Sequence, residues 1–157
     1  MKSKAMILPS WWSNENSFPV MKQVLELENK LSALSGLLDS TGRFLDKVKA
    51  PVPVQYKIKL ILDEIFSNIV SYGYRPGDPP DIIRIEMTLR DGKFTAVIND
   101  GGIPFNPLEY NQADITLPAE KRPIGGLGIH LIRNLTGELS YERKENRNVF
   151  CFSIKIE

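Results

Sequence analysis

The chain has 157 residues, of which 42% are hydrophobic and 25% charged, and its 20 basic and 19 acidic residues give a net charge of +1. This length and composition are those of one globular domain that can bury its own core. A near-neutral charge offers no broad basic face for nucleic acid, so we expect no nucleic-acid partner.

A single cysteine excludes a disulfide within the chain. Cys151 lies in the apolar run 149–156, which predicts a buried strand residue rather than a reactive thiol. The apolar run from Ala5 to Leu8 is too short for a signal peptide or a membrane span, because Pro9 interrupts it. We therefore expect a cytoplasmic protein that does not insert into a membrane.

Residues 1–20 differ from the rest of the chain, because turn-forming residues surround Trp11 and Trp12 without a sustained period. This extension is either a loosely ordered tail or an arm that buries both tryptophans against the domain or a partner. A regular pattern begins at Met21, where alternation predicts a first strand that ends near Asn29. We accordingly place the domain at residues 21–157.

Two helices are expected next. The first carries an apolar stripe and is weakened by two glycines, Gly36 and Gly42. The stripe consists of Leu31, Leu34, Leu38, Phe44, Leu45 and Val48. Pro51 and Pro53 then precede a second helix, predicted from Val54 to Tyr72.

The remaining elements are mostly strands. Residues 82–89 and 94–99 form a predicted hairpin through Asp91-Gly92, and residues 138–144 and 149–156 form another through residues 145–148. Between the hairpins lie a long loop, residues 100–123, and a third helix from about Gly125 to Gly137. The sum is an α+β two-layer sandwich with a mostly antiparallel sheet and helices on one face.

Glu64 and Asn68 stand four residues apart in the second predicted helix, so both project from one face. Apolar neighbours place this carboxylate and amide close to the buried side of the helix, where polar groups need partners. Two interpretations stay open. Either the two side chains are solvated or bond each other, or Asn68 gives an oxygen to a hard cation while Glu64 orients or deprotonates a nucleophile.

The strand 94–99 runs into Asp100-Gly101-Gly102. Asp-Gly after a strand is common turn chemistry, and a simple turn would account for it. The functional alternative is that Asp100 accepts a hydrogen bond from an exocyclic amine, such as that of adenine. Gly102 would then let the base approach the backbone.

The run Gly125-Gly126-Leu127-Gly128-Ile129 opens the third helix, and free backbone N–H groups at a helix start favour phosphate. No Gly-Lys-Ser/Thr follows as in a Walker loop, and no strand feeds directly into the run as in a dinucleotide-binding unit. These two nucleotide-binding patterns are therefore excluded.

Taken in order, the three clusters resemble the N, G1 and G2 boxes of the Bergerat-fold (GHKL) ATPases, the superfamily of gyrase, the Hsp90 chaperones, histidine kinases and MutL. Within it, the chain is most similar to the short anti-sigma-factor serine/threonine kinases, over roughly residues 21–157. The resemblance is carried by the run Leu60–Tyr74, the run Asp100–Phe105 and Gly126-Leu127-Gly128.

The resemblance implies a role for each matching position. Asn68 would bind the Mg²⁺ ion that bridges the ATP phosphates, Asp100 would recognise the adenine amine, and Glu64 would be the general base for a serine hydroxyl. Further ATP contacts are implied at Gly102, Gly126, Leu127 and Gly128. Catalysis of this kind consists mainly of positioning and charge neutralisation, so few side chains suffice.

Two positions depart from the family's pattern. Asn148 stands in for a threonine that helps to bind adenine through water, and an amide can still form that bond. An arginine is usual just before the last box, where this chain has Ile124 and Gly125. Lys121 or Arg122, slightly upstream, could reach the γ-phosphate from the loop, or neither does so.

Three conspicuous side chains are expected to have ordinary roles. His130 in the third helix is not expected to be phosphorylated, because no acceptor motif surrounds it. Tyr72 and Tyr74, just after the N box, are expected to be packing aromatics of the core and loop.

Three functions compete. The first is an ATP- and Mg²⁺-dependent serine/threonine kinase that phosphorylates an anti-sigma-factor antagonist and alternately sequesters a sigma factor, with homodimerisation expected from the family. The alternative is a non-catalytic ATP-binding switch that docks on a phosphatase or another signalling protein. The third is a detached histidine-kinase catalytic domain, which needs a separate phospho-acceptor helix and usually has a lid longer than the one in this chain.

Overall fold

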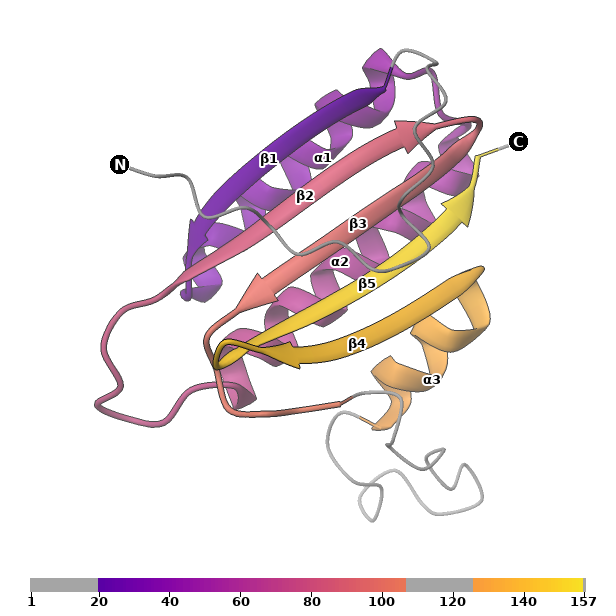
Figure 1. Cartoon of the computed structure of the whole chain (residues 1–157). Helices are drawn as coiled ribbons and strands as arrows, with labels where there is room; N and C mark the ends of the chain where they lie inside the picture. Colours follow the sequence, from indigo (N-terminus) through magenta and orange to yellow (C-terminus); the bar gives the residue numbers. More distant parts are fainter. Residues whose placement is uncertain (1–19, 107–125, 157) are drawn as a thin grey trace.

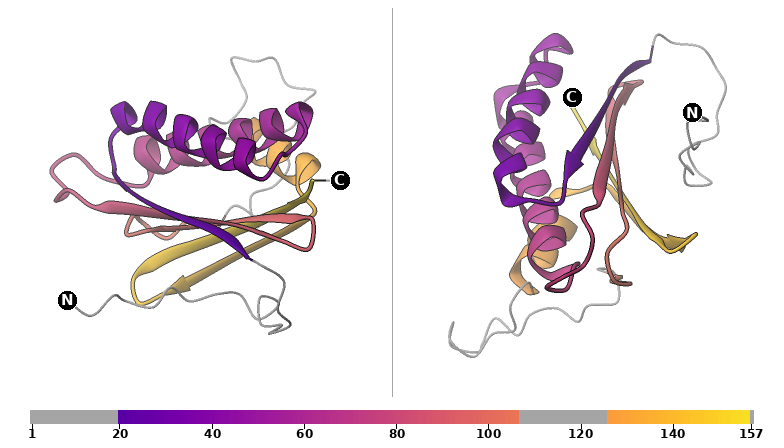
Figure 2. Two further views of the ribbon diagram at one scale, coloured as in Figure 1. Left: turned by 90° about the horizontal axis from the view of Figure 1, so that it is seen from above. Right: turned by 90° about the vertical axis from the view of Figure 1, so that its left-hand side faces the viewer.

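The computed structural model of the chain describes residues 20–106 and 126–156 (Figure 1). It shows the predicted α+β architecture, with a five-stranded sheet in the order β1-β2-β3-β5-β4 and the helices on one of its faces (Figure 2). The strands are β1 (Met21–Glu28), β2 (Ile82–Arg90), β3 (Lys93–Asp100), β4 (Glu138–Lys144) and β5 (Arg147–Lys155). Trp11 and Trp12, and the loop residues Lys121 and Arg122, lie outside the described residues.

Every strand pair in the described sheet is antiparallel. Tight two-residue turns join β2 to β3 and β4 to β5, and each has positive φ at both turn residues: 50° and 69° at Asp91 and Gly92, and 50° and 61° at Glu145 and Asn146. These values are those of hairpin turns that match the strand twist. The expected loop 145–148 is therefore wrong by two residues, since Arg147 and Asn148 already belong to β5.

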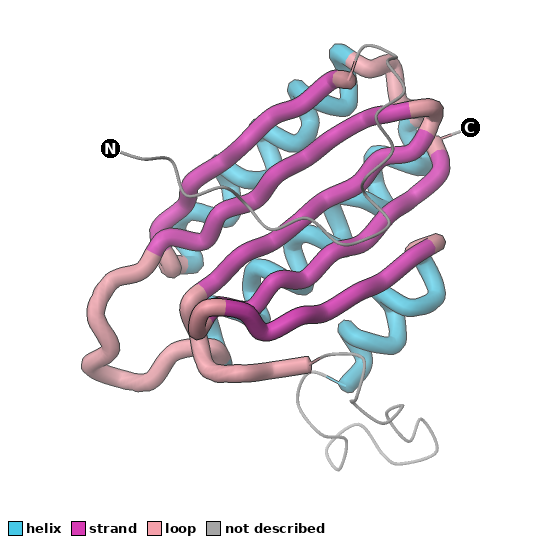
Figure 3. The backbone as a smooth tube through the Cα atoms, viewed as in Figure 1, coloured by secondary structure: helices cyan, strands magenta, loops and turns pink. Residues whose placement is uncertain are grey.

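The first helical segment consists of a short 3-10 turn, η2 (Leu31–Ala33), and helix α1 (Leu34–Lys47) (Figure 3). Its buried side differs from the expected stripe, because Leu31 is 55% exposed and Leu37, not Leu38, is fully buried. Gly42 is buried where α1 crosses α2, and a Cβ there would lie 3.0 Å from Lys59 Nζ. The glycine that weakened the helix prediction is thus a buried residue of α1 beside the flexible end of the Lys59 side chain on α2.

Helix α2 (Val52–Tyr72) begins two residues earlier than predicted, because Pro53 fits the first helical turn, where its missing N–H has no partner to lose. It packs between α1 and α3 (Gly126–Leu135). Its apolar side meets the sheet in one core, in which Phe94 packs against Phe44 and Phe152 with ring centroids 6.1 Å apart. Tyr72 is 54% exposed, so its assignment to the core is wrong.

Cys151 lies on the other face of the sheet, in a small buried cluster with Val97 and Val149. Its prediction as a buried strand residue is confirmed. Burial raises the pKa of the Cys151 thiol to about 12. Within the described residues, no helix combines the length and apolarity that crossing a membrane requires.

Candidate functional site

The three predicted clusters meet at one end of the fold, where α2, α3 and the end of β3 come together (Figure 1). On α2, Asn68 Nδ2 donates a hydrogen bond of 3.2 Å to Glu64 Oε1, so the two side chains bond each other as one interpretation expected. Both are only half-buried, which leaves them accessible from the solvent side. Asn68 Oδ1 accepts no hydrogen bond among the residues that the structure describes.

Gly128 of α3 lies directly against Glu64. A Cβ at position 128 would lie 1.9 Å from Glu64 Oε1 and 2.6 Å from Glu64 Cγ, so the Glu64 side chain would have to move to admit one. Gly126 and Leu127 occupy the first two positions of the same helix. The start of α3, with its free backbone N–H groups, therefore lies next to the carboxylate of α2.

The loop after β3 is held against the end of α2. Ile103 N donates to the carbonyl of Gly73 at 2.7 Å, and a Cβ at Gly102 would lie 2.6 Å from that same oxygen. Gly102 is therefore required for a close backbone contact. Because Gly73 directly follows α2, the loop that begins at Asp100 is fixed relative to the helix that carries Glu64 and Asn68.

Asp100 is only 3% exposed, and its carboxylate is held by hydrogen bonds to one of its two oxygens. Its Oδ1 accepts hydrogen bonds from Gly102 N at 2.9 Å and from Asn148 Nδ2 at 3.0 Å. Burial raises the pKa of the Asp100 carboxyl, although these two hydrogen bonds oppose the shift. Within the described ranges Oδ2 accepts none, so it is the oxygen left for a ligand with an N–H group.

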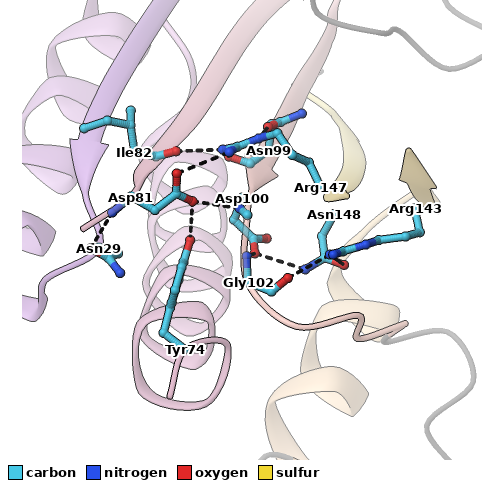
Figure 4. A network of polar contacts seen from close by, with 11 residues as sticks. Asn29, Tyr74, Asp81, Ile82, Asn99, Asp100, Gly102, Arg143, Arg147 and Asn148 are labelled. Carbon is cyan, nitrogen blue, oxygen red and sulfur yellow. Dashed lines mark hydrogen bonds and ion pairs between the residues drawn. The ribbon is translucent and has the colours of Figure 1, made fainter. Parts of the chain in front are cut away.

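Asn148 lies opposite Asp100 in the register of β3 and β5, and the short β4–β5 turn makes it the second residue of β5. Both of its amide hydrogens are used, in bonds to Asp100 Oδ1 and to the carbonyl of Ile103 at 2.9 Å. Its Oδ1 accepts from Tyr141 Oη at 2.6 Å. The same oxygen accepts from Arg143 Nη1 at 3.1 Å (Figure 4). Asn148 thus holds the Asp100 carboxylate, and its water-mediated contact with adenine stays a prediction.

Two contacts of this region were not predicted from the sequence. Arg143 Nη1 also donates to the carbonyl of Gly102 at 2.8 Å, which ties β4 to the glycine loop. Tyr74, expected only to pack, donates its hydroxyl to Asp81 Oδ2 at 2.7 Å. No local pattern marks these contacts, because Arg143 and Gly102 are 41 residues apart in the chain.

The described residues contain no group of three or more His, Cys, Asp or Glu side chains that could hold a metal ion. A metal at Asn68 would therefore need further ligands from a bound nucleotide and water. Mg²⁺ is commonly held in that way, through one or two protein oxygens and substrate phosphates. The uncommitted Oδ1 of Asn68, beside the Glu64 carboxylate, fits this ion.

His130 lies in α3, where its Nε2 is 3.0 Å from Nδ2 of Asn134, one turn further along the helix. This contact stays within the exposed side of α3. Among residues 20–106 and 126–156, the geometry gives His130 no partner in the region of Glu64 and Asp100, and the absence of phosphorylation stays a prediction.

Comparison with known proteins finds relatives that match the region containing these site residues. The family model described as the histidine kinase-like ATPase domain matches residues 27–154, which include the three clusters. The serine/threonine-protein kinase BtrW of Bordetella bronchiseptica is 29% identical over 97 residues, or 60% of this chain and 66% of that protein. The serine-protein kinase RsbW of Bacillus mycoides is 27% identical over 96 residues, or 59% of each chain. The chain thus spans less than two thirds of either relative.

Among solved structures, the RsbU and RsbW domains of Rv1364c from Mycobacterium tuberculosis align with a TM-score of 0.62 at 14% identity. The alignment covers 87% of this chain and 32% of that one. The blue-light activated histidine kinase EL346 of Erythrobacter litoralis aligns with a TM-score of 0.51 at 17% identity, over 68% of this chain and 32% of that one. At these identities the likeness concerns the fold.

Proposed function

The chain belongs to the family of histidine kinase-like ATPase domains, and from this premise we propose that it is an ATP-dependent serine/threonine protein kinase of the anti-sigma-factor type. Residues 21–157 form the ATP-binding domain and residues 1–20 an extension. Its substrate is a small anti-sigma-factor antagonist, its second partner a sigma factor, and its place of action the cytoplasm. The kinase names of the relatives BtrW and RsbW support this choice.

The observation that carries the proposal is the position of Glu64 between Asn68 and Gly128. A general base must be held rigidly and yet stay accessible, and Glu64 meets both conditions because it is half-buried and bonded to Asn68. Glu64 accepts the proton of the substrate serine as the serine oxygen bonds to the γ-phosphorus. The bond from that phosphorus to the β–γ bridging oxygen breaks, and ADP leaves.

The other site residues bind and orient ATP. Asp100 accepts the adenine amine through Oδ2, Gly102 admits the base to the backbone, and Asn148 keeps the carboxylate in place. The backbone at the start of α3, from Gly126 through Leu127 to Gly128, contacts the phosphates. Asn68 is the protein ligand for Mg²⁺, which neutralises phosphate charge when bound. Lys121 or Arg122 is the candidate cation for the γ-phosphate.

The test is transfer of labelled γ-phosphate from ATP to a purified candidate antagonist. We compare the wild type with Glu64→Gln and with Glu142→Gln, which alters an exposed carboxylate of β4 outside the site. Loss of a general base lowers the rate about 100- to 10,000-fold, so Glu64→Gln is expected to lose transfer and Glu142→Gln to keep it. Transfer by the wild type no faster than by Glu64→Gln refutes the kinase.

A second candidate is the non-catalytic ATP-binding switch that docks on a signalling phosphatase. The observation that favours it is Asn148, whose amide hydrogens are both committed within the protein, where the resembling kinases have a threonine. Normal ATP binding by the wild type without transfer to any candidate substrate selects this function over the kinase.

A further inference from the structure

Asp81 directly precedes β2, and its backbone is held by hydrogen bonds independently of its side chain. The carbonyl of Asp81 accepts from Asn29 N at 3.1 Å, and Asp81 N donates to Asn29 Oδ1 at 3.2 Å. Asn29 directly follows β1, so these two bonds close the β1–β2 pair at this end of the sheet (Figure 4). The Asp81 carboxylate is therefore presented from a rigid edge.

The carboxylate of Asp81 collects hydrogen bonds from three separate parts of the chain. Oδ2 accepts from the Tyr74 hydroxyl at 2.7 Å and from Gly101 N at 2.8 Å, and Oδ1 accepts from Arg147 Nη1 at 3.2 Å. We call this set of four residues, Tyr74, Asp81, Gly101 and Arg147, the Asp81 bridge. It connects the segment after α2, the loop after β3 and the start of β5 (Figure 4).

The protonation states of Asp81 and Tyr74 suit the hydrogen bonds of the Asp81 bridge. Burial alone would raise the pKa of Asp81, but the bonds from Tyr74, Gly101 and Arg147 outweigh it and lower that pKa. Burial, followed by the hydrogen bond to Asp81, raises the pKa of Tyr74 above its ordinary value. Asp81 is thus a carboxylate and Tyr74 a neutral donor at neutral pH. Arg147 is anchored independently, since its Nη2 donates to the carbonyl of Ile82 at 2.8 Å.

Gly101, the contact of the Asp81 bridge in the loop, directly follows Asp100. A Cβ at position 101 would lie 2.7 Å from Asp81 Oδ2 and 3.0 Å from Arg147 Nη1, so the backbone itself must touch the carboxylate. Three successive backbone amides are fixed in this way. Gly101 N bonds Asp81, Gly102 N bonds Asp100, and Ile103 N bonds Gly73.

We propose that Asp81 is a positioning residue of the nucleotide site, which fixes the turn after Asp100 to the end of α2 and thereby aims the Asp100 carboxylate at the base. This inference rests on the proposed function. It explains why a part-exposed ion pair, with side chains 25% and 31% exposed, is combined with hydrogen bonds to a backbone turn. An ion pair of this exposure adds little stability by itself, whereas the direction of a recognition group affects affinity directly.

The test compares Asp81→Asn with Glu138→Gln in the full chain. Glu138, on the edge strand β4, forms an ion pair of 2.7 Å with Lys93 of β3, so its variant controls for the loss of a surface charge pair. We titrate each protein with MgATP and with MgGTP by calorimetry, and measure thermal unfolding and the hydrogen exchange of the Gly101 and Gly102 amides without nucleotide.

Asp81→Asn is expected to weaken ATP binding about tenfold, the size of effect that follows loss of one charge-assisted hydrogen bond. Its preference for ATP over GTP should fall, and both amides should exchange faster. Glu138→Gln should change none of these. If Asp81→Asn does not fold, Tyr74→Phe, which removes one hydroxyl, should give a smaller loss in the same direction.

The outcomes separate the two levels of the proposal. Suppose that the wild type binds ATP and that the folded Asp81→Asn protein has the same ATP affinity and the same ATP/GTP preference within about twofold. This result refutes the positioning role of Asp81 alone. A wild type that binds neither nucleotide refutes the proposed function and this inference with it.

Discussion

Replacing Gly128 with alanine tests the contact that brings α3 onto the Glu64 carboxylate. The new Cβ would lie 1.9 Å from Glu64 Oε1, which must retreat by about 1.1 Å to reach 3.0 Å, the shortest separation that real Cβ contacts show. Turning the carboxylate alone does not relieve the clash, because Glu64 Cγ is also only 2.6 Å away. The whole side chain must take another rotamer, and its bond to Asn68 is lost.

Gly36→Ala is the matched control, because Gly36 is the third residue of α1 as Gly128 is the third residue of α3. A Cβ at Gly36 meets nothing within 4 Å. Both variants gain the helix propensity of alanine, about 0.5–1 kcal/mol. The difference between their free energies of unfolding is therefore the cost of overpacking, about 1–3 kcal/mol.

Urea denaturation of the two variants measures this difference, and phosphotransfer measures its functional consequence. We expect Gly128→Ala to be the less stable protein by that amount and to lose transfer, while Gly36→Ala keeps both. Equal stability and equal transfer in the two variants would show that α3 does not press on Glu64, and the assignment of the site would have to change.

Asp100 and Cys151 give the remaining predictions. Because burial raises the pKa of Asp100, the folded state holds that proton more tightly, so ionisation of the carboxyl costs stability as the pH rises toward neutral. Asp100→Asn should therefore be at least as stable as the wild type in urea at neutral pH. It should nevertheless bind ATP about tenfold or more weakly by calorimetry. Unchanged ATP affinity would show that Asp100 does not belong to the adenine pocket. The buried Cys151 thiol should resist a colorimetric disulfide reagent in the folded protein and react fully in denaturant, and rapid reaction without denaturant would contradict its raised pKa.

The sequence was sufficient for most of the fold because its signals are local. Alternation and the Asp91-Gly92 turn placed β2 and β3, and the apolar period placed α2. The errors occurred where tertiary packing decides. Leu37 rather than Leu38 faces the sheet, and the Glu145-Asn146 turn adopts positive φ without the glycine that usually marks such a turn.

The site was predicted as three clusters, and the structure adds what joins them. Gly102 and Gly128 were singled out for contact with a nucleotide, and each also makes a close contact within the protein, with Gly73 and Glu64. Asp81 carries no local signal, since its partner Arg147 is 66 residues away. Such contacts depend on the strand register, and a shift of one residue between β3 and β5 would have moved Asn148 away from Asp100.

The most direct test of the account is a calorimetric comparison of MgATP with MgGTP on the wild-type chain. Asp100 offers only an acceptor, which suits the exocyclic amine of adenine and opposes the carbonyl oxygen at the same position of guanine. We predict saturable binding of ATP at one site per chain and GTP binding weaker by about tenfold or more. Absence of ATP binding, or equal affinity for both nucleotides, would contradict the assignment of Asp100 and with it the proposed site.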